Sequence, residues 1–294
     1  MEGAITTRPA WEGRYVAGLA ALVAAAVAVH LPAWVDMGRI AVTNEEASHV
    51  LLVPLVAGWL LYLRRGQFAE IAPRPSLIGP AVLAAGWLLS WIGFYHRVQA
   101  FWHGGAVLAA VGAVLTFTGW PVVRRFWMVL LVLAFLVPVP GGIRQEIAIP
   151  LQTLTAKATA GLLQLVGLEV VRSGNALHFN DQAVAVAEAC NGMRMVFVLV
   201  LVCYAVAFAN PLRGWVRALL LVVSPLVAIA ANILRLAPTV YLFGYWPDSW
   251  GPLFHDLSGW AMIALAFALL MGLVGLLRRS PLNVDLPGGG GLTP

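Results

Sequence analysis

Long apolar runs separated by short polar segments make up most of the chain. A helix that crosses a bilayer needs about 20 mostly apolar residues. Eight stretches approach this length: 16–35, 49–63, 77–95, 104–120, 122–140, 191–209, 216–243 and 257–277. The pattern therefore predicts an all-α polytopic membrane protein with about eight transmembrane helices. The seventh stretch contains Pro225 and Pro238, and proline removes a backbone donor, so we expect that helix to be bent or broken.

The segment 141–189, between the fifth and sixth stretches, has a different pattern. Residues 146–168 are amphipathic, which favours a helix that lies on or dips into the membrane interface. The residues after it alternate and are rich in β-branched side chains, with turn-forming residues at 173–175 and 180–181. We expect short strands and hairpins there. This small β element leads directly to Cys190.

The distribution of positive charge predicts the orientation of the chain. Eleven of the 18 Lys and Arg residues fall in one alternating set of loops, and every loop of that set holds at least two. Cytoplasmic loops are enriched in positive residues, so we expect cytoplasmic N- and C-termini and a multi-pass protein of the plasma (inner) membrane. The segment 141–189 is then extracytoplasmic. The first stretch exceeds the usual apolar core of a signal peptide, which favours an uncleaved anchor.

Composition narrows the class of protein further. Hydrophobic residues make up 61% of the 294 positions and charged residues only 11%, which excludes an ordinary soluble or disordered chain. The net charge of +5 does not indicate nucleic-acid binding, because the basic residues form short clusters between apolar spans. We expect one integral-membrane domain over 1–277 and a disordered cytoplasmic tail over 278–294. The tail contains a run of four glycines.

Polar residues inside membrane spans are costly and therefore informative. Cys190 lies at the predicted outer end of the sixth span, close in sequence to Glu188, Asn191 and Arg194. A lone membrane cysteine is most often a small packing residue. A helix N-terminus beside a guanidinium, however, favours the reactive thiolate. Cys203 has no such neighbours, and we assign it to packing.

Arg235 is the most costly residue in the chain, because it falls deep inside the seventh span. Asn232 lies three residues earlier on the same helical face and can hydrogen-bond either Arg235 or a substrate. Arg235 is either a structural partner of a carboxylate such as Glu188 or a binder of an oxyanion. Arg194 is likewise either a catalytic support residue or an interhelical anchor.

His255 stands at the predicted outer end of the eighth span, next to Asp256. The predicted topology places Cys190, Arg235 and His255 on the same side of the bilayer. A cysteine, a histidine and an oxyanion-binding cation are the components of a thiol acyl-transfer site. The sequence contains no HExxH or CxxC metal motif and no nucleotide-binding loop, so we expect neither a metal nor a cofactor.

Several short motifs resemble the exosortase/archaeosortase family of polytopic membrane cysteine transpeptidases. The motifs are 189–193 (Ala-Cys-Asn-Gly-Met), 232–235 (Asn-Ile-Leu-Arg), 254–256 (Phe-His-Asp) and 48–55, which begins Ser-His. The resemblance covers about 44–277. Many relatives have serine after the nucleophilic cysteine, where this chain has Asn191. The resemblance implies that Cys190 is the nucleophile and that Arg235 and His255 are its catalytic partners.

The resemblance also implies a class of substrate. Family members process membrane-anchored proteins whose C-terminal sorting tail has a short signature such as Pro-Glu-Pro, a transmembrane helix and a basic cluster. Such a tail would place its signature at the depth of Cys190. The acceptor of the processed protein would be a lipid, a glycan or water.

Two other functions remain open from the residues alone. A transporter would place charged residues near the midplane of broken helices, and the seventh span contains two prolines. A non-catalytic scaffold for envelope or polysaccharide export would need no thiol. Both alternatives predict that blocking Cys190 has no effect.

Overall fold

The computed structural model describes residues 11–71, 73–186 and 192–246, together with scattered positions between 250 and 275. The chain forms two compact units, Met1–Pro140 and Gly141–Pro294. The tail 278–294 and most of the predicted eighth span lie outside the described residues.

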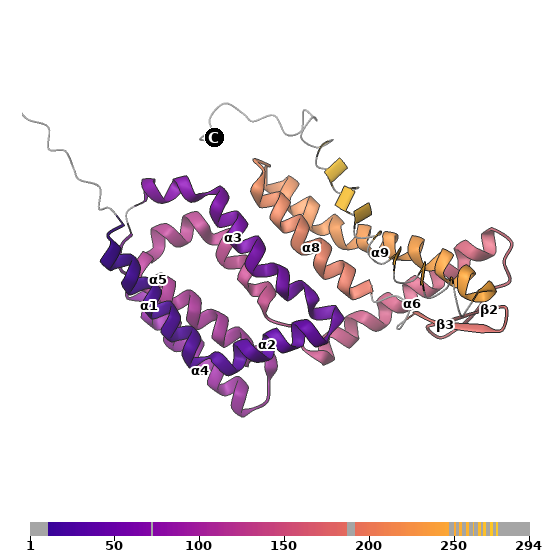
Figure 1. Ribbon diagram of the computed structural model, residues 1–294, viewed down its shortest axis with the longest axis horizontal. Coiled ribbons are helices and arrows are strands. Elements are labelled where there is room, and N and C mark those ends of the chain that lie inside the picture. The colour runs from indigo at the N-terminus through magenta and orange to yellow at the C-terminus, as the bar shows by residue number, and fades with distance from the viewer. Residues whose placement is uncertain are drawn as a thin grey trace, which may run out of the picture. The chain divides into compact units, whose positions relative to one another are not determined.

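The first unit is helical (Figure 1). Its elements are α1 (Gly13–Val29), α2 (Leu31–Thr43), η1 (Glu45–Leu52), α3 (Val53–Leu63), η2 (Arg65–Glu70), α4 (Ile78–Tyr95), α5 (Gln99–Val132) and η3 (Leu133–Leu136). Within the described residues of both units, four helices are long and apolar enough to cross a membrane, or five if the bent pair α1–α2 is one span. The chain is thus a mainly helical polytopic membrane protein.

The first predicted span, 16–35, is not one straight helix. The chain bends by 73° between α1 and α2, and His30 between them has non-helical dihedrals. Pro32 occupies the first turn of α2. Proline has no N–H to donate and its ring crowds the carbonyl four residues earlier, so Pro32 favours an interruption of the helix at this position.

Helices α4 and α5 pack with their backbones in contact. Glycines recur every seven residues on both: Gly79, Gly86 and Gly93 on α4, and Gly105 and Gly112 on α5. A Cβ added at any of these five would collide with backbone atoms of the other helix. Lipid provides little hydrophobic drive for helix association, so close approach through small residues is a main source of packing energy in membranes.

The backbone of α5 leaves the helical conformation at Gly119, where φ is 66°. A Cβ at this position would collide with the carbonyl oxygen of Arg74, and Pro121 follows two residues later. Glycine alone combines this left-handed dihedral with so close an approach. The predicted boundary between the fourth and fifth spans, at residue 121, falls at this interruption.

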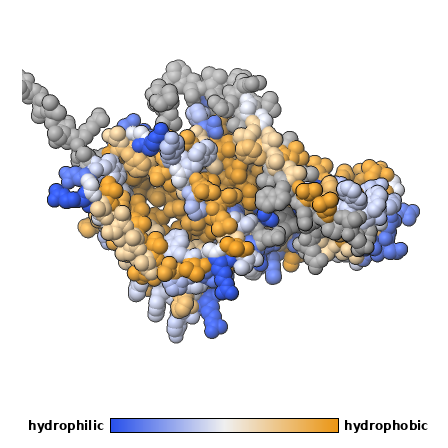
Figure 2. Space-filling model, in the orientation of Figure 1, coloured by the Kyte–Doolittle hydropathy of each residue, from blue (hydrophilic) through white to orange (hydrophobic). Residues whose placement is uncertain are grey.

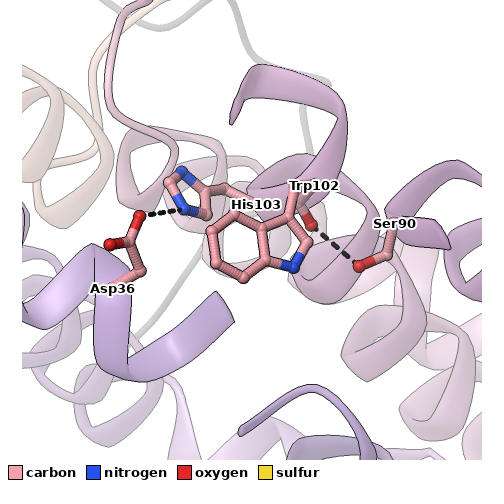
Figure 3. A network of polar contacts seen from close by, with 4 residues as sticks. All are labelled: Asp36, Ser90, Trp102 and His103. Carbon is pink, nitrogen blue, oxygen red and sulfur yellow. Dashed lines mark hydrogen bonds and ion pairs between the residues drawn. The ribbon is translucent and has the colours of Figure 1, made fainter. Parts of the chain in front are cut away.

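Two side-chain hydrogen bonds link helices inside the first unit (Figure 3). The His103 imidazole Nε2 of α5 donates to Asp36 Oδ2 of α2 at 3.0 Å, and His103 is fully buried. The Ser90 hydroxyl of α4 donates to the carbonyl oxygen of Trp102 at 3.0 Å. Polar contacts of this kind between helices fix their register where no water competes.

The second unit joins helices to a small sheet. Its elements are α6 (Gly141–Leu165), β1 (Val171–Ser173), β2 (Ala176–Phe179), β3 (Gln182–Ala185), α8 (Gly192–Ala209) and α9 (Gly214–Tyr245). The strands form an antiparallel sheet in the order β1-β2-β3. Asn180 and Asp181 both have positive φ, as a two-residue hairpin turn requires. Strands and turns therefore occupy the segment for which the sequence predicts them.

An apolar cluster holds α6, the sheet and α9 together. The buried members come from α6 (Ala156, Ala160, Leu163), from the sheet and its flanks (Val170, Leu177, Phe179, Val184, Val186) and from α9 (Leu236, Ala237, Val240). Polar side chains of α6 tie down the first turn of the sheet, because Asn175 contacts both Gln152, at 3.1 Å, and Thr153, at 2.9 Å. Polar side chains of α6 therefore hydrogen-bond with the turn between β1 and β2.

Helix α9 is continuous over 32 residues although it contains Pro225 and Pro238. The sequence predicts a bent or broken helix here, and the helix is not broken, because it runs without interruption from Gly214 to Tyr245. Pro225 cannot donate to the carbonyl of Leu221, but the neighbouring Ser224 hydroxyl donates to that oxygen at 2.9 Å. Satisfying the freed carbonyl in this way is how membrane helices tolerate proline.

Apolar side chains cover much of the visible surface (Figure 2). Large hydrophobic residues with high exposure include Trp59, Trp87, Trp91, Leu55 and Leu226. A water-soluble domain would bury such residues, whereas a bilayer solvates them. The surface thus agrees with a membrane-embedded chain.

Candidate functional site

The candidate site in the described residues centres on Arg235 of α9. Its side chain is 7% exposed and that of Asn232, one turn earlier, is 2% exposed. Arg235 Nη2 donates to Asn232 Oδ1 at 3.3 Å. The i, i+3 spacing that the sequence analysis relied on therefore brings these two side chains together, as predicted.

Arg235 lies well inside the helix. It is ten residues before the end of α9 at Tyr245, which corresponds to roughly 15 Å along the axis. A guanidinium at such depth is costly unless it faces protein or a polar cavity. Its burial in the second unit satisfies that condition.

Thr239 extends the polar stripe of α9 by another turn. It is fully buried, and its hydroxyl donates to the carbonyl oxygen of Arg235 at 2.8 Å. The sequence analysis did not single out Thr239, although its position four residues after Arg235 on the same helical face was a visible signal. Asn232, Arg235 and Thr239 thus form one buried polar stripe.

The same turns of α9 carry an apolar stripe that binds the sheet. Leu236, Ala237 and Val240 pack against α6 and the strands. Val186, which directly follows β3, is buried in that cluster, and its N–H donates to the carbonyl oxygen of Asn175 at 2.9 Å. The strand segment that leads toward Cys190 in sequence is therefore anchored on α9 beside Arg235.

Helix α8 begins on the other side of Cys190 in sequence. Met193 and Met195 are buried, and Arg194 between them is half-buried in the first turn. Helix α8 packs along α9. Both segments that flank residues 187–191 in sequence are thus packed against the helix that carries Arg235.

The remaining predicted site residues lie outside the described part of the chain. These are Cys190 and His255, the neighbouring Glu188 and Asn191, and Asp256. Cys203, by contrast, is described: its side chain is 1% exposed in the middle of α8, within hydrogen-bonding reach of Ser224 on α9. That environment suits the packing role predicted for it. Among the described residues, no three His, Cys, Asp or Glu side chains form a group able to hold a metal ion.

Comparison with known proteins shows a match to one protein family. The family model described as transmembrane exosortase (Exosortase_EpsH) matches residues 34–272. That range covers most of the chain, including both flanks of Cys190, the stripe that contains Arg235, and His255. No curated protein and no solved structure matches the chain.

Proposed function

Because the chain belongs to the transmembrane exosortase family, we propose that it is a membrane-embedded cysteine transpeptidase or endopeptidase. Its substrates are exported, membrane-anchored proteins with a C-terminal sorting tail. The observation that carries this proposal is the buried Arg235–Asn232 pair, on the same turns of α9 as the apolar stripe that packs against the strands preceding Cys190. A buried guanidinium held in place by a neighbouring amide is suited to stabilising an oxyanion.

The proposed reaction begins with the thiol of Cys190. His255 accepts the thiol proton, and the thiolate sulfur attacks the scissile carbonyl carbon. Arg235, oriented by Asn232, stabilises the negative charge that develops on the carbonyl oxygen. When the tetrahedral intermediate collapses, the C–N bond breaks and His255 protonates the leaving amine.

The acylation step leaves a thioester between Cys190 and the substrate. An acceptor nucleophile, a lipid or a glycan, or else water attacks this thioester and loses its proton to His255. When the C–S bond breaks, His255 returns that proton to the released Cys190 thiolate. Glu188 and Arg194 support the site, with Arg194 pairing an acidic residue of the signature.

The membrane setting supports this class of substrate. In the proposed orientation both termini are cytoplasmic, and the sheet, α6 and Cys190 face the outer side of the inner membrane. A sorting tail in the bilayer would lie beside these spans with its basic cluster inside. Holding the peptide bond next to the nucleophile supplies a large part of acyl-transfer catalysis.

Co-expression with a tail-bearing precursor tests the proposal by immunoblot of precursor size. Cys190→Ala, Arg235→Ala and His255→Ala should each abolish processing at normal enzyme abundance. Residues that act as one catalytic unit are non-additive, so the triple variant should be no worse than the worst single variant. Cys203→Ala is the matched control and should process normally. Normal processing by Cys190→Ala would exclude the thiol mechanism.

A transporter or an export scaffold would behave differently in the same strains. In either case, alkylating Cys190 from outside would leave function intact. The two prolines in α9, which suggested a transporter-like broken helix, lie in a continuous helix. The broken helix that suggested a transporter is therefore not present at these prolines.

A further inference from the structure

Strand β3 is an edge of the three-stranded sheet. Val186, just past its end, donates its N–H to the carbonyl oxygen of Asn175. In an antiparallel pair, successive residues of a strand direct their backbone groups alternately toward the partner and away from it. Counting back from Val186, Ala183 and Ala185 direct their N–H and C=O groups away from β2.

These outward groups are available within the described structure. No described residue hydrogen-bonds with the backbone of Ala183 or Ala185 on that side, and Ala183 is exposed. Neither alanine has a bulky or charged side chain that would obstruct an approaching strand. The edge of β3 therefore has two alternating donor–acceptor pairs, spaced as a strand requires.

The opposite edge of the sheet differs. Strand β1 has three residues, and the hairpin register leaves only Arg172 with outward backbone groups. The Arg172 guanidinium donates to the carbonyl oxygen of Gly174 at 2.8 Å. Short length and a charged side chain are common protections of an edge against pairing. Of the two edges, β3 is therefore the one whose backbone groups are more accessible to a further strand.

We propose that the edge of β3 binds the extended signature of the sorting tail by strand addition, which rests on the proposed function. Strand addition gives affinity through main-chain hydrogen bonds. The strand lies on α9 through the apolar cluster that includes Leu236, next to Arg235, and Cys190 follows Ala185 by five residues. A peptide on this edge is held along the segment that leads to the nucleophile.

A signature in which proline alternates with another residue fits this edge. In an extended peptide, alternate residues face the same side. When the middle residue of Pro-Glu-Pro directs its N–H and C=O toward β3, both prolines face away, where a missing N–H costs no hydrogen bond. A shift by one residue would turn both prolines toward the edge and lose their donors. The edge therefore favours a peptide whose two prolines are separated by one residue.

Disulfide cross-linking tests the proposal without turnover. In a Cys190→Ala, Cys203→Ala background, Ala183→Cys or Ala185→Cys is combined with single cysteines scanned through the signature of a precursor. Residues opposite one another on neighbouring strands have Cβ atoms about 4.5–5.5 Å apart. We expect cross-links from both positions, with the preferred signature positions shifted by two residues between them. Arg172→Cys on the opposite edge is the control and should not cross-link.

Cross-linking from Arg172→Cys as efficient as from Ala183→Cys would overturn the proposal. So would the absence of cross-links from both alanine positions while the precursor co-purifies with the enzyme. Processing by the wild-type enzyme is measured on the same precursor. A precursor that is cross-linked at β3 but never cleaved by the wild type would contradict the proposed function and leave the edge assignment standing.

A kinetic variant adds an independent test. Ala183→Pro removes one outward N–H and leaves the hydrogen bonds between β2 and β3 in place. Processing should slow by roughly five- to tenfold, the effect of losing one hydrogen bond in a bound complex. Arg172→Pro makes the same change on the opposite edge and should stay within about twofold of wild type. Equal effects of the two substitutions would contradict strand addition at β3.

Discussion

Arg235 Nη2 lies 3.3 Å from the side-chain oxygen of Asn232, one turn away on α9, and both side chains are buried. The hydrogen bond fixes one edge of the guanidinium plane. A planar, fixed set of donors presents its remaining N–H groups in a defined direction. In the proposed reaction, this arrangement orients the substrate oxygen more strictly than a lone cation on a flexible stem would.

Replacing Asn232 with alanine should slow processing without removing the enzyme from the membrane. Hydrogen bonds to charged groups are worth about 1.5–3 kcal/mol, which corresponds to roughly a 10- to 100-fold loss of rate. Arg235→Lys should fail completely, because lysine keeps the charge but not the planar fork. Quantitative immunoblots of precursor and product over time provide the measurement. A wild-type rate for Asn232→Ala would show that Arg235 does not depend on this partner.

The backbone contact between α4 and α5 predicts a sharp difference between two adjacent glycines. A Cβ at Gly105 would collide with the backbone of Ser90, whereas a Cβ at Gly104 would meet only Val137 Cγ2 at 4.0 Å. Gly105→Ala should destabilise the protein by about 1–3 kcal/mol, as overpacking usually does. Gly104→Ala should be neutral or stabilising, since alanine favours helix. Thermal unfolding in detergent micelles compares them, and equal midpoints would contradict the close packing.

Removing the acceptor of the Asp36–His103 hydrogen bond should lower the stability of the folded protein. Asp36→Ala leaves the buried Nε2 of His103 without its acceptor, at a cost of about 1–3 kcal/mol. Asp36→Asn keeps an acceptor oxygen and should lose less. Thermal unfolding midpoints of Asp36→Ala and Asp36→Asn, measured in the same detergent, compare the two losses of stability. If Asp36→Asn is as unstable as Asp36→Ala, the hydrogen bond is not what stabilises this contact.

Thiol labelling distinguishes the two cysteines. Cys203 is 1% exposed in α8 and should resist a membrane-impermeant maleimide in intact cells. Cys190, in the proposed outward-facing site, should react, and the label should disappear in Cys190→Ala. Labelling of Cys203 in place of Cys190 would reverse the proposed orientation of α8.

Local signals in the sequence located many of the elements. Apolar run length predicted a polytopic helical membrane protein, because the transfer cost of each residue is a property of that residue. The turn at Asn180 and Asp181 and the Asn232–Arg235 contact were also predictable, since both depend on neighbours within four residues. The bend at His30 was not predicted, although Pro32 follows it by two residues. The unbroken course of α9 depends on the Ser224 hydroxyl, which donates to the carbonyl that Pro225 leaves without a donor.

Contacts between distant residues were decided only by the tertiary structure. Asp36 and His103 are 67 positions apart, and no pattern in either helix identifies the other as its partner. The glycine repeats of α4 and α5 permit close backbone packing only because the two helices pack against each other. Local hydropathy and helical spacing in the sequence thus determined the class of protein, a mainly helical polytopic membrane protein, and the contact between Asn232 and Arg235. The packing of the sheet on α9 beside Arg235 was decided by long-range burial, because it depends on side chains brought together from three separate segments.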